Sequence, residues 1–151
     1  MNPFKRILFA TDFSDCSQPA RRVAESLAVK LSAELHLLHV IADPAVYVLD
    51  PTALPAEAIH EMLAQREAES IAALNRLPEE GADEIQSTVR ATRQGAARDE
   101  IVHYAEENNI DLIVIGTHGR TGLGRLVLGS VAEGVVRLAK CPVLTVRANE
   151  A

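Results

Sequence analysis

The stretch LIVIGTHGRTGLGRLVLGS, residues 112–130, decides how this chain is organised. It begins with a wholly apolar run, residues 112–115, and ends where apolar residues begin to recur at helical spacing, residues 131–139. Between them, residues 116–130 hold five of the chain's 8 glycines. Glycine lets a backbone come close to a ligand, and the N–H groups of such a loop and of a helix start can surround an anion. The stretch therefore predicts a strand, a phosphate-binding loop and a helix in immediate succession.

Two common phosphate-binding motifs do not match this loop. The Walker motif G-x-x-x-x-G-K-[ST] is missing because no lysine precedes Ser130. The dinucleotide motif G-x-G-x-x-G is missing because Gly122-x-Gly124 is followed by Val127 where a glycine is required. Ser130 adds a hydroxyl to the loop, and three of its side chains can carry positive charge: His118, Arg120 and Arg125. An exposed flexible turn, with the arginines as simple surface charge, is the alternative interpretation at this point.

The rest of the chain alternates between strand and helix patterns. Short apolar or alternating runs predict strands at residues 6–10, 34–41, 87–93, 112–115 and 143–146, and helical spacing predicts helices at about 17–31, 56–77, 97–107 and 131–139. This β-α-β-α-β-α-β-α-β order favours one α/β domain, residues 1–151, with an open parallel sheet and helices on both faces. Ligands of such folds bind beyond the carboxyl ends of the strands, so we expect a site at Asp12 and Gly116.

Several finer expectations follow from the same patterns. Arg21 is expected to point outward from the first helix, and Ile71 inward from the second. His36 and His39 lie inside a predicted strand and are expected to be packed histidines. The proline-rich segment 42–55 is too apolar for a plain linker and is interpreted as a lid or an interface.

Composition narrows the function. The 151 residues carry a net charge of −6, which argues against general nucleic-acid binding because that requires a basic face. Apolar runs are too short for a membrane span, and the N-terminus lacks the apolar core of a signal peptide. Cys16 and Cys141 lack the spacing of a metal or redox motif. These features predict a cytoplasmic protein with reduced thiols and no membrane partner.

The chain resembles the universal stress protein family along nearly its whole length. The nucleotide-binding branch of that family carries G-x2-G-x9-G-[ST], which stands here as Gly116-x2-Gly119-x9-Gly129-Ser130. Three further segments agree: ILFATDFS at 7–14, LLHV at 37–40 and CPVLTV at 141–146. The resemblance implies strand order 3-2-1-4-5 and ATP, or ADP or AMP, bound between the first and fourth strands.

The resemblance also implies a role for each matching residue. Asp12 would meet the ribose or a Mg²⁺ ion bound to the phosphates, and Val40 would meet adenine. Residues 116–120 would surround the ribose and phosphates, and residues 129–131 would hold the outer phosphates. The implied nucleotide site is Ala10, Thr11, Asp12, Val40, Gly116, Thr117, His118, Gly119, Arg120, Gly129, Ser130 and Val131. Family members often have proline where this chain has Ala10. From the residues alone, Asp12 has the alternative of capping a turn.

Three functions remain open on this evidence. No Walker lysine and no nucleophile–base pair is apparent, so we favour a nucleotide-dependent regulatory protein with an unidentified protein partner. A slow ATPase is the alternative, because bound ATP and a metal can react by positioning alone. A ligand-free structural dimer is the third. Strand 143–146 is expected at a sheet edge, uncharged until Arg147, and both this edge and the family resemblance predict a homodimer formed through it. A monomer whose edge is covered by residues 147–151 is the alternative.

Overall fold

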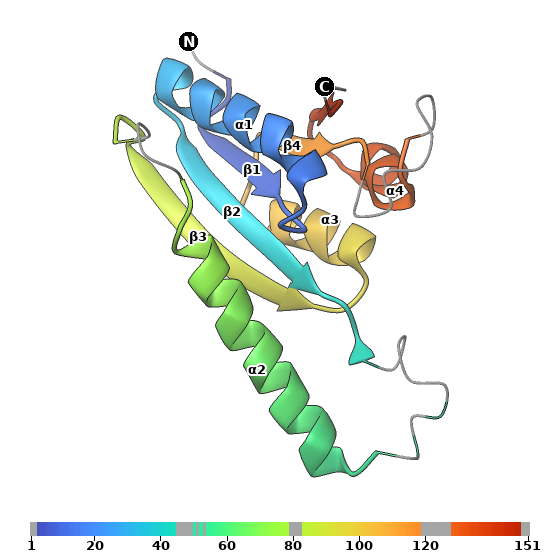
Figure 1. Ribbon diagram of the computed structural model, residues 1–151. Coiled ribbons are helices and arrows are strands. Elements are labelled where there is room, and N and C mark those ends of the chain that lie inside the picture. Colours follow the sequence, from blue (N-terminus) through green and yellow to red (C-terminus); the bar gives the residue numbers. More distant parts are fainter. Residues whose placement is uncertain are drawn as a thin grey trace.

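A computed structural model describes residues 3–44, 50, 52, 54–78, 83–118 and 128–148. Its five strands form one parallel sheet in the order β3-β2-β1-β4-β5, as expected (Figure 1). The strands are β1 (Arg6–Ala10), β2 (Glu34–Ile41), β3 (Ser87–Gln94), β4 (Leu112–Gly116) and β5 (Val143–Val146). The helices are α1 (Gln18–Leu31), α2 (Ala56–Leu74), α3 (Ala97–Glu107) and α4 (Ser130–Leu138), with a short 3-10 turn, η1, at Asp15–Ser17.

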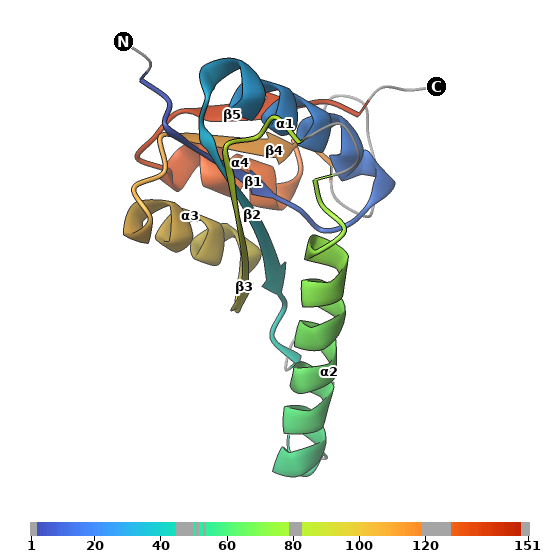
Figure 2. The ribbon, with the colours of Figure 1, turned by 90° about the vertical axis from the view of Figure 1, so that its left-hand side faces the viewer.

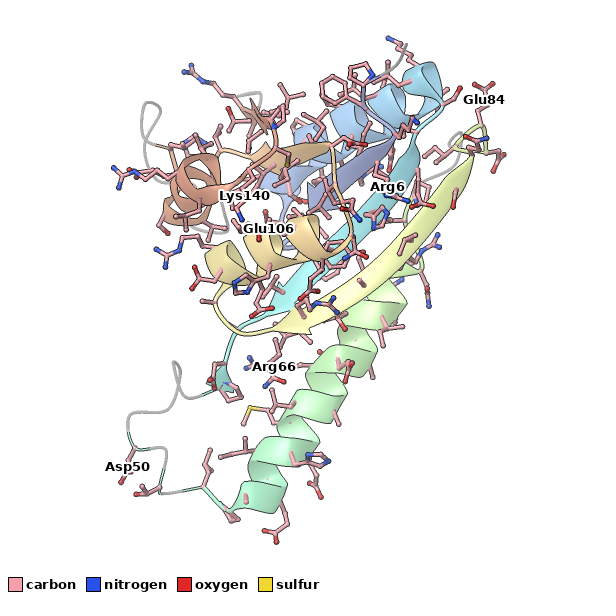
Figure 3. The ribbon with its side chains drawn as sticks, turned by 180° about the vertical axis from the view of Figure 1, so that it is seen from behind. Arg6, Asp50, Arg66, Glu84, Glu106 and Lys140 are labelled. Atoms are coloured by element: carbon pink, nitrogen blue, oxygen red, sulfur yellow. The ribbon has the colours of Figure 1, made fainter. Side chains whose placement is uncertain are left out.

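The sheet separates two layers of helices, as Figure 2 shows from the side. α1 and α2 cover one face, where Ala20, Ala24 and Ala28 of α1 are fully buried. α3 and α4 cover the other face, and the ion pair between Lys140 and Glu106, 3.2 Å long, joins the end of α4 to α3 (Figure 3). β1 and β4 are covered on both sides, which explains why their sequences are apolar without alternation. The central strands therefore form the core.

β1 is shorter than its neighbour β2, and this difference creates the site described below. The pairing of β1 with β2 ends at Ala10 opposite Leu38, and its pairing with β4 ends at Ala10 opposite Ile115. β2 continues to Ile41 beside β3. The strand order reverses at β1, and the segments that follow β1 and β4 leave the sheet toward opposite faces.

Two of the finer expectations were wrong. Arg21 is buried, with 3% of its surface exposed, because its guanidinium is satisfied within α1 by Gln18 and by Glu25, at 2.7–3.0 Å. Ile71 is 45% exposed, because the buried line of α2 runs through Ser70 and Leu74. One residue along a helix is a rotation of about 100°, so Ile71 points away from that line.

The second helix also ends earlier than expected, at Leu74. Arg90 of β3 explains where it stops, since its guanidinium donates to the carbonyls of Leu74 and Leu77 at 2.6–3.0 Å. α2 begins well beyond the ends of β2 and β3 in both views (Figures 1 and 2). Most of segment 42–55, interpreted above as a lid or an interface, lies outside the described residues. No described helix is both long enough and apolar enough to cross a bilayer.

Candidate functional site

A cavity of about 200 Å³ opens at the carboxyl ends of β1, β2 and β4, where the strand order reverses. Ten of the twelve residues predicted for the site line it: Ala10, Thr11, Asp12, Val40, Gly116, Thr117, His118, Gly129, Ser130 and Val131. The other two, Gly119 and Arg120, lie outside the described residues, as does Arg125. The sequence pattern and the geometry thus select the same edge of the sheet.

One wall of the cavity is the turn that follows β1. The carboxylate oxygen Oδ1 of Asp12 accepts the backbone N–H and the hydroxyl of Ser14, at 2.9 and 2.6 Å. The Ser17 hydroxyl donates to the carbonyl of Ser14 at 2.7 Å, and Thr11 Oγ1 accepts the N–H of Phe13 at 2.9 Å. Asp12 therefore caps the turn and lines the cavity at the same time, so the two interpretations of this residue are compatible.

The opposite wall is formed by the two ends of the glycine loop. The Gly129 N–H donates to the carbonyl of Thr117 at 2.6 Å, and the Thr117 N–H donates to the carbonyl of Val146 at 3.0 Å. The chain thus leaves β4 and returns to the same point before α4 begins. Residues 119–127 of this loop are outside the described part of the chain. The hydrogen bonds hold the start of α4 against the end of β4.

α4 begins at the cavity with an open N-terminus. Its N-cap is Gly129, which has no side chain to cap the helix, and no side-chain capping bond is formed among the described residues. The first N–H groups of a helix have no partner within the helix, so those of Ser130 and Val131, which line the cavity, are available to an anion. Gly129 has φ −58° and ψ 153°, values open to any residue. The backbone conformation at position 129 therefore does not require a glycine.

The third wall is the part of β2 that extends past β1. In a parallel ladder, successive residues turn their N–H and C=O groups to opposite sides of the strand. Glu34 and Leu38 bond toward β1, through Lys5 and Thr11, whereas Ile41 bonds toward β3 through Gly95. Val40 therefore turns its N–H and C=O toward the side of β1, which has already ended. An N–H donor and a C=O acceptor at one position suit the edge of a planar base.

Sequence reasoning missed seven residues that line the cavity: Ser17, Leu38, His39, Ala97, Ile101, Ile115 and Ala132. Leu38, Ile101, Ile115 and Ala132 also belong to the core, so their burial pattern is that of ordinary core residues. His39 was expected to be simply packed. It does stack on the Phe13 ring, with centroids 4.5 Å apart, but it also borders the cavity.

His36, by contrast, is packed as expected. It is 4% exposed, and its ring nitrogens contact Glu34 at 2.8 Å and the Tyr104 hydroxyl at 2.7 Å. The bond from His36 lowers the pKa of the Glu34 carboxyl, and burial raises the pKa of Tyr104. Within the described residues, no group of three or more His, Cys, Asp or Glu side chains is arranged to hold a metal ion.

An open parallel sheet with a cavity at its switch point places the chain in a broad class of α/β proteins that bind ligands there. The model of the universal stress protein family matches residues 3–147, and the chain belongs to this family. It is 38% identical to the universal stress protein MJ0531 of Methanocaldococcus jannaschii over 97% of this chain and 84% of that protein. It is 34% identical to the universal stress protein YxiE of Bacillus subtilis, over 95% of this chain and 99% of that one.

Solved structures support the same assignment. The structure of the protein MJ0577 superposes with a TM-score of 0.84 at 28% identity, covering 98% of this chain and 99% of that one. Two more distant structures, at 22% and 23% identity, share the fold with TM-scores of 0.64 and 0.61. Each covers 97% of this chain, and 99% and 100% of the solved ones. These two are universal stress proteins solved in complex with cAMP and with dAMP.

Proposed function

We propose that this chain binds an adenine nucleotide, ATP in its functional form, and acts as a nucleotide-dependent regulatory protein. The observation that carries the proposal is the cavity, in which the open backbone edge of Val40 faces the same space as the uncapped start of α4. One end suits a base and the other suits phosphate. The bound nucleotide would change the surface that the protein offers to a protein partner.

The base is proposed to lie against Val40. The adenine edge carries an N6 amino donor next to the N1 acceptor, which matches the C=O and N–H of one residue. Guanine presents the reverse order at the same edge, an oxygen acceptor next to an N–H donor. Leu38, Ala97 and Ile101 add apolar side chains to the lining of the cavity. Adenine is therefore the base whose hydrogen bonds this edge would satisfy.

The phosphates are proposed to lie at the start of α4. The amides of Ser130 and Val131 and the Ser130 hydroxyl would donate to phosphate oxygens, and the helix dipole favours negative charge there. Asp12 would reach the ribose hydroxyls or a Mg²⁺ ion carried by the phosphates, since carboxylate and phosphate oxygens are the ligands that Mg²⁺ prefers. Gly119 and Arg120 would complete the contacts to ribose and phosphate.

The direct test is analysis of the nucleotide released when purified protein is heat-denatured. We expect an adenine nucleotide at near one molecule per chain. A sample that holds none, and that takes up none when incubated with ATP and Mg²⁺, would leave the structural, ligand-free dimer as the better account. Steady-state phosphate release from the ATP-loaded protein separates the regulatory protein from the slow ATPase, because only the ATPase continues to release phosphate after one turnover.

We also propose that two copies pair through β5. In a single chain this strand is at the edge of the sheet, with β4 on one side only. Three of the four large apolar side chains that are exposed among the described residues lie on β5 and the neighbouring α4: Leu144, Val136 and Leu138. An uncovered apolar edge favours pairing with a second strand, and a two-fold axis would close the assembly.

Replacing Leu144 with lysine is expected to convert the dimer into a monomer. Leu144 is 37% exposed, whereas Val146 packs partly against the core, so Leu144 is the position at which a charge disturbs association more than folding. Light scattering at micromolar concentration measures the mass. The matched control is Ile71→Lys, which places the same charge on an exposed apolar position of α2 and should leave the dimer intact. A monomer mass for the unmodified protein would rule the dimer out.

A further inference from the structure

The pairing of β1 with β2 lacks the backbone hydrogen bond that would come next in the ladder. A side chain is bonded to the carbonyl that would accept it. The Thr11 N–H still donates to the Leu38 carbonyl, at 2.9 Å, as in a continuing parallel ladder. The next ladder bond would run from the Val40 N–H to the Thr11 carbonyl. Between these two described residues it is not formed, and the Thr11 carbonyl is bonded to Nδ1 of His39 at 2.8 Å.

The chemistry of this contact identifies the donor. A carbonyl oxygen only accepts, so Nδ1 of His39 carries the hydrogen. The ring is held in this orientation by Phe13, which stacks on it at 4.5 Å with an interplanar angle of 35°. Phe13 itself has φ +62°, a left-handed conformation that is uncommon for a bulky residue. The turn after β1 thus keeps an unfavourable backbone conformation that places an aromatic ring against His39.

We propose that His39 is a positioning residue that sets base recognition by keeping the Val40 N–H out of the ladder. By satisfying the Thr11 carbonyl with its side chain, His39 removes the need for the ladder bond at that point and leaves the Val40 N–H facing the cavity. This inference rests on the proposed nucleotide function for its ligand. Its structural part, the competition between His39 and Val40 for one carbonyl, stands independently of any nucleotide.

The substitution that tests it is His39→Leu, which removes the donor and keeps an apolar side chain beside Phe13. The Thr11 carbonyl then takes the nearest backbone donor, the Val40 N–H, and the ladder extends by one bond. The matched control is His39→Asn, whose side-chain N–H group occupies a position close to that of Nδ1 and can keep the bond to Thr11. Thermal melts of both variants check that they fold.

The first measurement is amide hydrogen exchange of Val40 by NMR in nucleotide-free protein. We expect the Val40 amide to exchange about tenfold or more slowly in His39→Leu than in the unmodified protein or in His39→Asn, because it has gained a hydrogen bond. The second measurement compares ATP with 1-deaza-ATP, which lacks the N1 acceptor. The unmodified protein should bind ATP about tenfold more tightly than 1-deaza-ATP, the value of one hydrogen bond, and His39→Leu should bind both equally.

The outcomes separate the two levels of the proposal. A Val40 amide that exchanges at the same rate in all three proteins would overturn the role of His39, whatever the nucleotide affinities. If the unmodified protein binds neither nucleotide, the proposed function fails, and the exchange rates still decide whether His39 controls the ladder. Loss of ATP preference in His39→Leu, with its retention in His39→Asn, supports the inference in full.

Discussion

Gly129→Asp is expected to lose ATP binding while the protein stays folded and α4 becomes no less stable. A carboxylate at this N-cap position would accept the N–H groups at the start of α4, which Gly129 leaves uncapped. It would also repel the phosphates that are proposed to use those groups. Losing two charge-assisted hydrogen bonds costs about 3 kcal/mol or more, which is at least about a hundredfold in Kd. Titration with a fluorescent ATP analogue measures this change.

Two further variants complete this test. Ser130→Ala removes only the hydroxyl and should weaken binding by on the order of 1.5–3 kcal/mol, less than Gly129→Asp. Gly129→Ala keeps the N–H that donates to Thr117 and adds no charge, and it serves as the control for side-chain volume. Because the backbone of Gly129 has φ −58°, neither substitution at this position requires a left-handed backbone conformation. Unchanged affinity in both Gly129→Asp and Ser130→Ala would remove α4 from the proposed site.

ATP with Mg²⁺ should raise the melting temperature of nucleotide-stripped protein by roughly 5–10 °C. A ligand that binds only the folded state at 100 times its Kd contributes about 2.7 kcal/mol, and a chain of this size converts each kcal/mol into about 2–4 °C. The comparison is made with and without Mg²⁺, since Asp12 is proposed to act partly through the metal. A differential scanning experiment on the dialysed protein provides the measurement.

Asp12→Asn tests the contribution of the carboxylate within the same experiment. The amide oxygen of asparagine can still accept from the backbone and hydroxyl of Ser14, so the turn after β1 should be retained. The Mg²⁺-dependent part of the melting shift should shrink, because the negative charge is gone. A full Mg²⁺ response in this variant would argue that Asp12 only caps the turn, and no response to ATP in the unmodified protein would contradict nucleotide binding altogether.

Much of the fold follows from local patterns in the sequence. The five strands and four helices lie close to their expected positions, because apolar runs, helical spacing and turn residues act over a few neighbouring positions. The ends of elements are less well predicted. α2 stops at Leu74, whose carbonyl accepts from Arg90 of a strand later in the chain. The order of the strands came from the family resemblance, since alternation alone does not determine which strand lies beside which.

The end of the cavity that is proposed for phosphate could be predicted from the sequence for a similar reason. Gly116, Gly129 and Ser130 belong to one loop, and a cluster of glycines between a strand and a helix is a local signal. The packing of charged residues was harder to predict from the sequence. Arg21 was expected outside because arginine usually is, and its contacts with Gln18 and Glu25 help to make its burial possible.

The end of the cavity that is proposed for the base depends on tertiary structure. His39 and Thr11 are 28 positions apart, and their hydrogen bond lies where β1 ends at Ala10, beside a turn that holds Phe13 with positive φ. Nothing within β2 distinguishes the backbone of Val40 from that of Leu38, since both turn to the same side of the strand. The two residues differ because β1 still pairs with β2 at Leu38 and has ended at Val40. The sequence by itself determined the elements and the glycine loop, whereas the open edge of Val40 depends on contacts between distant segments that no local pattern encodes.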